Sequence, residues 1–183
     1  MRNEYRISPS YTMSQENNQT MLAAYEAYAD AIYRHCYFRV YNADLARDIM
    51  QETFCKTWAY MAEGKEVKNM KAFLYRVANN LIIDEARKKK ESSLDELTEK
   101  GIVPNSIVTE DDTEKRILTK EVLLLVNKLD ESYQTVIIMR FIDELSPKEI
   151  AGILDTSENS VSVKIHRGIE KLRDLGKNNN LIE

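Results

Sequence analysis

The sequence predicts an all-α protein made of two small helical domains. Only five glycines and three prolines occur in 183 residues, so the chain has few of the residues that end helices or form turns. Apolar side chains recur at helical spacing along most of its length. The stretch 91–114 breaks that pattern and is rich in Glu, Asp, Ser and Thr. We therefore expect a flexible acidic linker at 91–114, joining domains at 21–90 and 115–176, with tails at 1–20 and 177–183.

Composition excludes several classes of protein. No apolar run approaches the ~18 residues that a membrane-spanning helix needs, and the N-terminus has no apolar signal core. We therefore expect a cytoplasmic protein that does not insert into membranes. Two cysteines, Cys36 and Cys55, are too few for a disulfide framework, and with only two histidines we expect no metal and no cofactor. The net charge of −4 argues against non-specific coating of DNA, although the local distribution of charge matters more than the total.

The first domain is predicted to hold three helices. A tyrosine-rich helical pattern covers about 21–41, a second helix covers about 42–61, and a third follows the charged loop 62–69 and runs to about 90. The second helix should bury a stripe that comprises Leu45, Ile49, Met50, Phe54, Trp58 and Met61.

The outer face of the second helix is acidic and amide-bearing. It comprises Asp44, Asp48, Gln51, Glu52 and Lys56. Such a face is usually just solvated, but it also suits the docking of a basic partner helix. Periodicity alone does not decide between these two interpretations.

The third helix combines a polar face with a basic end. Phe73, Leu74, Val77, Leu81 and Ile82 should point inward, and the polar face carries Lys71, Tyr75, Arg76, Asn79 and Asn80. The helix ends in the basic run 87–90, which in part complements the helix macrodipole. Basic charge interleaved with aromatic residues also suits a surface for single-stranded nucleic acid.

The second domain should begin with helices at 115–128 and 133–142. Their core positions are Leu118, Val122, Leu125, Leu129, Val136, Ile137, Phe141 and Ile142. A glycine at 176 is expected to stop the last helix.

The stretch 146–173 predicts two helices joined by a tight turn. Ser146, Pro147 and Glu149 form a helix start with the pattern of a capping box. The turn at 155–157 offers new N-caps, and the following helix has one apolar face. On the opposite face, Val163 and Arg167 point most directly outward. This arrangement is typical of a helix-turn-helix that reads the DNA major groove, although two amphipathic helices joined by a short turn also form ordinary hairpins.

The sequence contains no catalytic constellation. It has no phosphate-cradling glycine loop, no nucleophile elbow and no carboxylate–histidine pair with metal spacing. We therefore expect a protein that is not an enzyme.

Three segments, in order, resemble the bacterial RNA polymerase sigma factors of the extracytoplasmic-function (ECF) type. Residues 48–54 (DIMQETF) resemble the core-binding pattern D-L-x-Q-E-x-F of that family. Residues 73–80 (FLYRVANN), with Asp84 and Arg87, resemble its W-L-x-x-I-A-x-N-x-x-x-D-x-x-R helix. The helix-turn-helix from Leu145 to Leu172 resembles its C-terminal DNA-binding motif.

The resemblance implies a role for each surface. The family has a region 2 that docks on the beta-prime clamp of core RNA polymerase and captures a flipped base of the −10 element, and a region 4 that meets the beta flap and reads the −35 element. It implies core-binding residues Asp48, Gln51, Glu52 and Phe54. It implies −10 DNA-binding residues Lys68, Lys71, Tyr75, Arg76, Asn80, Arg87 and Lys88. It implies −35 DNA-binding residues Ser157, Asn159, Ser160, Ser162, Val163, Lys164, His166 and Arg167. The family's partners are core polymerase, promoter DNA and, usually, a cognate anti-sigma factor.

Three positions depart from the family pattern. Arg47 stands where an acidic residue is usual, and Ser162 and Val163 replace a basic and a small polar residue. These changes leave Arg167 as the main long donor to a guanine or a phosphate.

Two other hypotheses remain open at the level of sequence. A stand-alone helix-turn-helix regulator would bind duplex DNA without polymerase at a palindromic site. A pure interaction module that keeps the fold would bind polymerase or a regulator but not promoter DNA.

Overall fold

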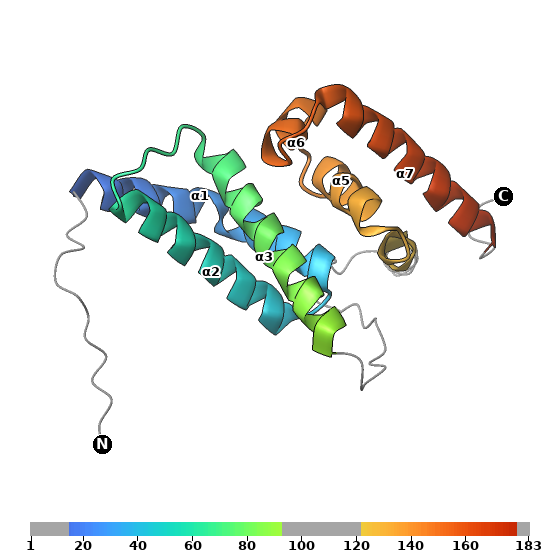
Figure 1. The fold of residues 1–183 in the computed structure, drawn as a ribbon, viewed down its shortest axis with the longest axis horizontal. Helices are drawn as coiled ribbons and strands as arrows, with labels where there is room; N and C mark the ends of the chain where they lie inside the picture. Colours follow the sequence, from blue (N-terminus) through green and yellow to red (C-terminus); the bar gives the residue numbers. More distant parts are fainter. Residues whose placement is uncertain (1–14, 93–121, 179–183) are drawn as a thin grey trace, which may run out of the picture.

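Every secondary-structure element in the described residues is a helix, which confirms the expected all-α class (Figure 1). The computed structural model describes residues 15–92 and 122–178. The expected linker, from residue 93 onward, lies outside these ranges, as does the first part of the helix expected at 115–128. The helices are α1 (Gln15–Val40), α2 (Ala43–Ala62), α3 (Met70–Ser92), a short segment at 122–127, α5 (Glu131–Phe141), α6 (Pro147–Ile153) and α7 (Glu158–Asn178).

Helices α1, α2 and α3 pack against one another as an N-terminal bundle (Figure 1). The side chain of Asn42 starts α2 by accepting a hydrogen bond from the backbone N–H of Leu45, at 2.9 Å. Asn69 does the same for α3 through the N–H of Ala72, at 3.0 Å. Gly64, with a φ of 79°, lies in the turn after α2. The bundle core includes Ile32, Cys36, Tyr37, Ala46, Phe54, Leu74, Ala78 and Ile82.

The face that α2 buries differs from the predicted stripe. Trp58, expected inside, is 38% exposed, whereas Thr53 and Thr57 are fully buried. Each threonine hydroxyl donates to the carbonyl four residues earlier in the helix, at 2.8 Å. Their polar atoms are therefore satisfied within the helix, and a small side chain lets neighbouring helices approach closely.

The C-terminal unit is held together by α5, which packs against both α6 and α7. Val136, Ile138 and Met139 of α5 are fully buried. A Cβ atom added at Gly168 of α7 would lie 3.0 Å from Ile137 Cγ1. Glycine at this position therefore permits the close approach of α7 to α5.

The helix-turn-helix has the predicted capping. Ser146 Oγ accepts from the backbone N–H of Glu149 at 3.3 Å, and the Glu149 carboxylate accepts from the N–H of Ser146 at 2.8 Å. Both halves of the capping box are thus present at the start of α6. The turn passes through Asp155, with a φ of 50°, and Ser157 Oγ accepts from the N–H of Ser160 at 3.2 Å.

Four local expectations are wrong. Helix α1 begins at Gln15, so part of the expected N-terminal tail is helical, because α1 continues over an exposed polar turn. Helix α7 runs to Asn178, so the buried Gly176 lies within it and does not stop it. Val122 and Phe141, expected in the core, are 46% and 54% exposed, because the buried face of this unit is completed by Leu123 and Met139.

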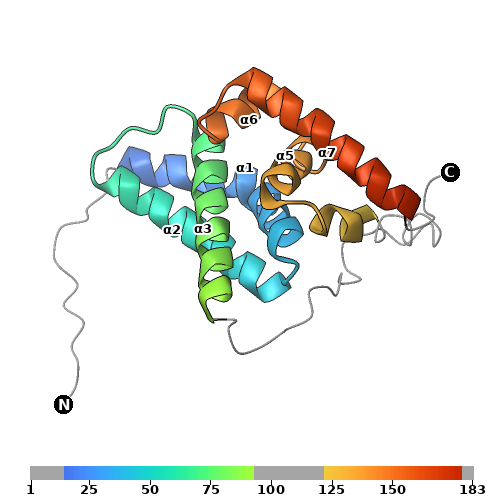
Figure 2. The same cartoon turned by 45° about the vertical axis from the view of Figure 1, so that its right-hand side comes forward.

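The two helical units lie against each other. The C-terminal half of α1 lies beside α5, and the start of α3 lies beside α6 (Figure 2). At the first contact, His35 Nδ1 is 2.7 Å from Asp143 Oδ2, and both side chains are completely buried. Residues far apart in the sequence are thus joined by a polar contact in the interior.

We expect Ser146→Ala to lower the free energy of unfolding of the C-terminal unit by about 1 kcal/mol, because it removes one half of the capping box. Chemical denaturation followed by circular dichroism measures this change. Ser162→Ala, the same chemical change at an exposed position within α7, should alter stability by less than about 0.5 kcal/mol. Equal losses in both variants would contradict the assigned role of the cap.

Candidate protein- and nucleic-acid-binding surfaces

The acidic outer face of α2 is exposed. Asp48, Gln51 and Glu52, three of the four predicted core-binding residues, all lie on it. Glu52 pairs with Lys56 one turn later at 3.4 Å. Exposed pairs of this kind are weak, so these side chains can change partners at little cost. The face is therefore available to a basic partner.

Phe54, the fourth predicted core-binding residue, is buried and does not lie on this face. Its ring meets the edge of the Tyr25 ring with centroids 4.9 Å apart, so that it packs α2 against α1. A contribution of Phe54 to docking would therefore be indirect, through the position of α2.

The predicted −10 residues, with Lys68 in the loop before α3 and six on α3, fall into three groups: exposed side chains, side chains that contact α6, and the buried Tyr75. Lys68, Asn80, Arg87 and Lys88 are exposed. Arg87 pairs with Asp84 at 3.0 Å. Lys71 and Arg76 are instead engaged by α6: Lys71 Nζ is 2.9 Å from Glu149 Oε1, and Arg76 donates to the carbonyls of Gly152 and Ile153.

Tyr75, expected on the polar face of α3, is buried, with 1% of its surface exposed. Its ring meets the ring of His35 with centroids 5.2 Å apart. Burial raises the pKa of the Tyr75 hydroxyl above its ordinary value. The residue fills the space between α3 and α1, although sequence periodicity marks its position as exposed.

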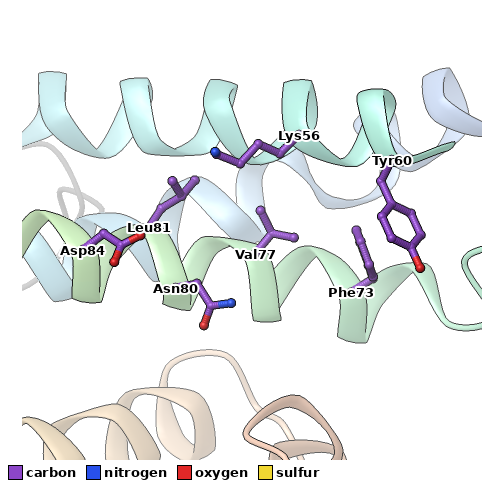
Figure 3. A pocket seen from close by; sticks show the side chains of 7 residues that line it. All are labelled: Lys56, Tyr60, Phe73, Val77, Asn80, Leu81 and Asp84. Atoms are coloured by element: carbon purple, nitrogen blue, oxygen red, sulfur yellow. The ribbon is translucent and has the colours of Figure 1, made fainter. Parts of the chain in front are cut away.

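A pocket of about 310 Å³ opens between α2 and α3 (Figure 3). This volume is at the small end for ligand sites. Tyr60 and Phe73 meet at one end of the pocket, with ring centroids 4.8 Å apart, and Lys65 Nζ lies 5.0 Å from the centre of the Tyr60 ring. The lining residues are Lys56, Tyr60, Phe73, Val77, Asn80, Leu81 and Asp84. Apolar and aromatic walls with an amide and charged groups at the edge suit a planar, polar-edged group such as a nucleobase.

The outer face of α7 is exposed as predicted. Val163 is 41% exposed, and Ser157, Asn159, Ser162, His166 and Arg167 are exposed as well. Ser160 and Lys164 are half-buried, while Val161 on the opposite face is fully buried. His166 Nε2 lies 3.3 Å from the carboxylate of Glu170. A helix about 30 Å long with this polar outer face can lie in a major groove.

Neither a metal site nor a membrane span emerges from the described ranges. Residues 15–92 and 122–178 contain no group of three His, Cys, Asp or Glu side chains able to hold a metal ion. No helix in the same ranges is long and apolar enough to cross a membrane.

Comparison with family models identifies two segments of the chain. Residues 24–92 match the model described as Sigma-70 region 2, and residues 119–172 match the model described as Sigma-70, region 4. The ECF RNA polymerase sigma factor SigW of Bacillus subtilis is 34% identical over 157 residues, which are 81% of this chain and 84% of that protein. The chain is an ECF-type sigma factor of the sigma-70 family.

Other relatives of this sigma factor agree with that assignment. SigM of Bacillus subtilis, also an ECF sigma factor, is 27% identical over 153 residues, covering 82% of this chain and 91% of that protein. The fold matches the sigma factor RpoE in its complex with the anti-sigma factor NepR from Bartonella quintana. That match has a TM-score of 0.67 at 20% identity and covers 90% of this chain and 98% of that chain. A complex of CnrH with the cytosolic domain of CnrY gives a TM-score of 0.65 at 19% identity, over 86% and 88%.

Sequence reasoning missed the side chains that join the two units of this sigma factor. His35, Arg39 and Asp143 are buried where α1 meets α5 and the turn before α6. The available signal was a histidine and an arginine one turn apart at the end of a tyrosine-rich helix. That pattern does not identify the residues that His35 and Arg39 contact, because those residues lie about a hundred positions away in the sequence.

Proposed function

We infer that this sigma factor is a promoter-specificity subunit that binds core RNA polymerase, recognises −35 and −10 elements and assists DNA opening. The observation that carries this inference is the presence of both sigma regions in one chain that is 34% identical to an ECF sigma factor over most of its length. It is not an enzyme itself, and it acts in the cytoplasm, where its polymerase is.

Docking on polymerase is assigned to the exposed acidic face of α2. Asp48, Gln51 and Glu52 lie on one side of a helix that is held from behind by Phe54 and Tyr25. A rigid helix with surface carboxylates favours a basic partner helix such as the beta-prime clamp. Charge complementarity of this kind speeds association and fixes orientation.

Capture of the −10 strand is assigned to α3 and the pocket beside it. A base must leave the stack before a protein can read its edge, which costs a few kcal/mol. Stacking on Tyr60 or Phe73 and a hydrogen bond from the Asn80 amide would offset this cost. The exposed cations Lys68, Arg87 and Lys88, and Lys71 and Arg76 once released from α6, would follow the phosphate backbone.

Recognition of the −35 element is assigned to α7. Arg167 is its longest outward donor and suits the O6 and N7 acceptors of guanine, while Val163 can contact a thymine methyl. Ser157, Asn159, Ser160 and Ser162 at the N-terminal end of the helix would contact base edges or phosphates, with Lys164 and His166 nearer the groove wall.

A regulatory partner follows from the same family. The sigma factor RpoE, which has a similar fold, was co-crystallised with the anti-sigma factor NepR, and CnrH was solved in complex with the cytosolic domain of CnrY. We therefore include a cognate anti-sigma factor among the partners of this chain.

The function is tested by transcription in vitro with core polymerase, this protein and fragmented genomic DNA of the host, followed by sequencing of transcript 5′ ends. We expect discrete starts that share two upstream elements, because both DNA-reading regions are present in one chain. Tight duplex binding without polymerase at a palindromic site would favour a stand-alone regulator instead. Association with core polymerase without any defined starts would favour a pure interaction module.

We expect the double variant Asp48→Arg, Glu52→Arg to lose association with core polymerase, because it reverses the charge of the docking face. Both positions are exposed, so the fold should persist, as circular dichroism would report. Glu26→Arg with Asp30→Arg is a matched control, since these exposed carboxylates have the same spacing on α1. If the first variant co-purifies with core polymerase as well as the control does, the docking face is assigned wrongly.

We expect Arg167→Ala to weaken binding to the −35 duplex by ~1–3 kcal/mol and to relax its sequence preference, while core binding persists. Fluorescence anisotropy with duplexes that vary at each position, using the polymerase holoenzyme, measures both effects. Arg173→Ala removes the same charge further along α7 and should weaken all duplexes alike. If Arg167→Ala weakens the binding of all duplexes equally, Arg167 contacts a phosphate and does not read a base.

A further inference from the structure

Helix α7 rests on the remainder of the C-terminal unit through few buried positions. It lies along α5 in both views of the molecule (Figure 1, Figure 2). Its buried residues include Val161 near its start and Gly168 near its middle. The larger apolar side chains Ile165, Ile169 and Leu172 are only half-buried. The position of α7 on the unit therefore depends strongly on each of these few contacts.

There is no room for a side chain at Gly168. A Cβ atom at this position would lie 3.0 Å from Ile137 Cγ1, 3.1 Å from Ile137 Cδ1 and 3.7 Å from Tyr133 Cβ. Carbon atoms in contact normally lie about 3.5–4.0 Å apart. Ile137 is buried, so the close-packed core around it limits how far it can move. A methyl group at residue 168 would therefore push α7 away from α5.

A second contact with α5 follows one turn later, at Lys171. Its Nζ atom lies 5.2 Å from the centre of the Tyr133 ring and 3.6 Å from Asp130 Oδ2. Tyr133 therefore lies beneath both Gly168 and Lys171. Cation–π contacts and exposed ion pairs are each weak, so Lys171 helps to orient α7 but does not hold it alone.

The N-terminal end of α7 is fixed separately, to α6. The turn that joins the two helices spans only residues 154–157. Within it, the backbone N–H of Thr156 donates to the carbonyl of Ala151 at 3.0 Å. The side chain of Val161 is fully buried just beyond the turn. A helix that is fixed at its start and displaced at its middle tilts, so the contact at Gly168 determines the tilt of α7.

The tilt of α7 determines where its outer face meets DNA. Val163 precedes Gly168 by five residues and points about 140° away from it around the helix. A β-branched side chain in a helix has one strongly preferred rotamer, so the methyl groups of Val163 move with the backbone. The long side chain of Arg167 can follow a small displacement. Base reading by Val163 is therefore more sensitive to the tilt than base reading by Arg167.

We propose that Gly168 is a positioning residue for recognition of the −35 element: its lack of a side chain seats α7 on Ile137 and Tyr133 at the tilt that brings Val163 onto a thymine methyl. Lys171 supports the same seat through Tyr133 and Asp130. This proposal rests on the proposed assignment of the −35 element to α7. It adds the residue behind the reading face that controls how that face meets the bases.

The variant Gly168→Ala tests the seat directly. The probes are fluorescent duplexes that carry the −35 element defined by transcription in vitro, with each thymine in turn replaced by deoxyuridine, which lacks only the methyl group. For polymerase holoenzyme with the unaltered chain, we expect one replacement to weaken binding about fourfold, the value of one buried methyl group. With Gly168→Ala, the same replacement should have almost no effect, because Val163 no longer meets the methyl. An unchanged fourfold loss would overturn the proposal.

Two further variants separate the seat from general effects of alanine. Gly152→Ala on α6 is the matched control, since a Cβ atom there has no neighbour within 4 Å, and it should keep the sensitivity to the thymine methyl. Gly168→Ala with Ile137→Val moves one carbon atom from α5 to α7 and removes the Cδ1 contact, so it should restore that sensitivity. If the double variant behaves like Gly168→Ala alone, the contact with Ile137 is not the cause.

Lys171→Ala tests the same seat at an exposed position, where the fold is not at risk. We expect a smaller loss of sensitivity to the thymine methyl, with the salt dependence of duplex binding unchanged, because α5 engages the ammonium group. A phosphate contact would instead lower the slope of log K against log salt concentration by about one. A lower slope with full sensitivity to the methyl would contradict the role of Lys171 in the seat.

Val163→Ala distinguishes failure of the seat from failure of the proposed −35 function. If Val163→Ala removes the sensitivity to the thymine methyl and Gly168→Ala does not, α7 reads the −35 element but Gly168 does not position it. If neither Val163→Ala nor Arg167→Ala changes discrimination among duplexes, α7 does not read the −35 element, and both proposals are wrong.

Discussion

The contact between the Asp143 carboxylate and the His35 imidazole is the constraint on which the arrangement of the two units depends. Neither group is stable in the interior alone, because a buried charge or a buried ring nitrogen needs a hydrogen-bonding partner. Each therefore fixes the position of the other, at 2.7 Å, across an interface between distant parts of the chain. Once the α5–α6 turn is seated on α1, the position of α6 over the start of α3 follows from the shortness of that turn.

Apolar and polar burial have different roles in this molecule. The buried apolar side chains form one cluster that spans both units, with Ile32, Phe54 and Leu74 in one and Val136, Ile138 and Val161 in the other. Loss of that burial would unfold the unit, since each large side chain contributes ~1.5–3 kcal/mol. The interface between the units adds polar and charged groups whose partners water can replace. The polar contacts therefore add specificity to an association that the shared apolar cluster stabilises.

The sequence predicted those parts whose signals are local. The capping box at Ser146 and the outward position of Arg167 both follow from residues within a few turns of one another, and the structure agrees. Trp58 was misplaced because Thr53 and Thr57 satisfy their hydroxyls inside α2, which periodicity does not anticipate. Tyr75 was placed outside because its face of α3 is polar, whereas its ring packs in the interior against His35 of α1. Burial that depends on such long-range contacts leaves no periodic signal.

The distribution of charge explains how an acidic protein can be suited to DNA. With a net charge of −4, the chain as a whole is repelled by a phosphate backbone. Exposed carboxylates lie on α2 and cations on α3, where Lys71 pairs with the Glu149 carboxylate of α6 and Arg76 donates to two α6 carbonyls. The local distribution of charge, and not the total of −4, therefore decides which kind of partner each surface suits.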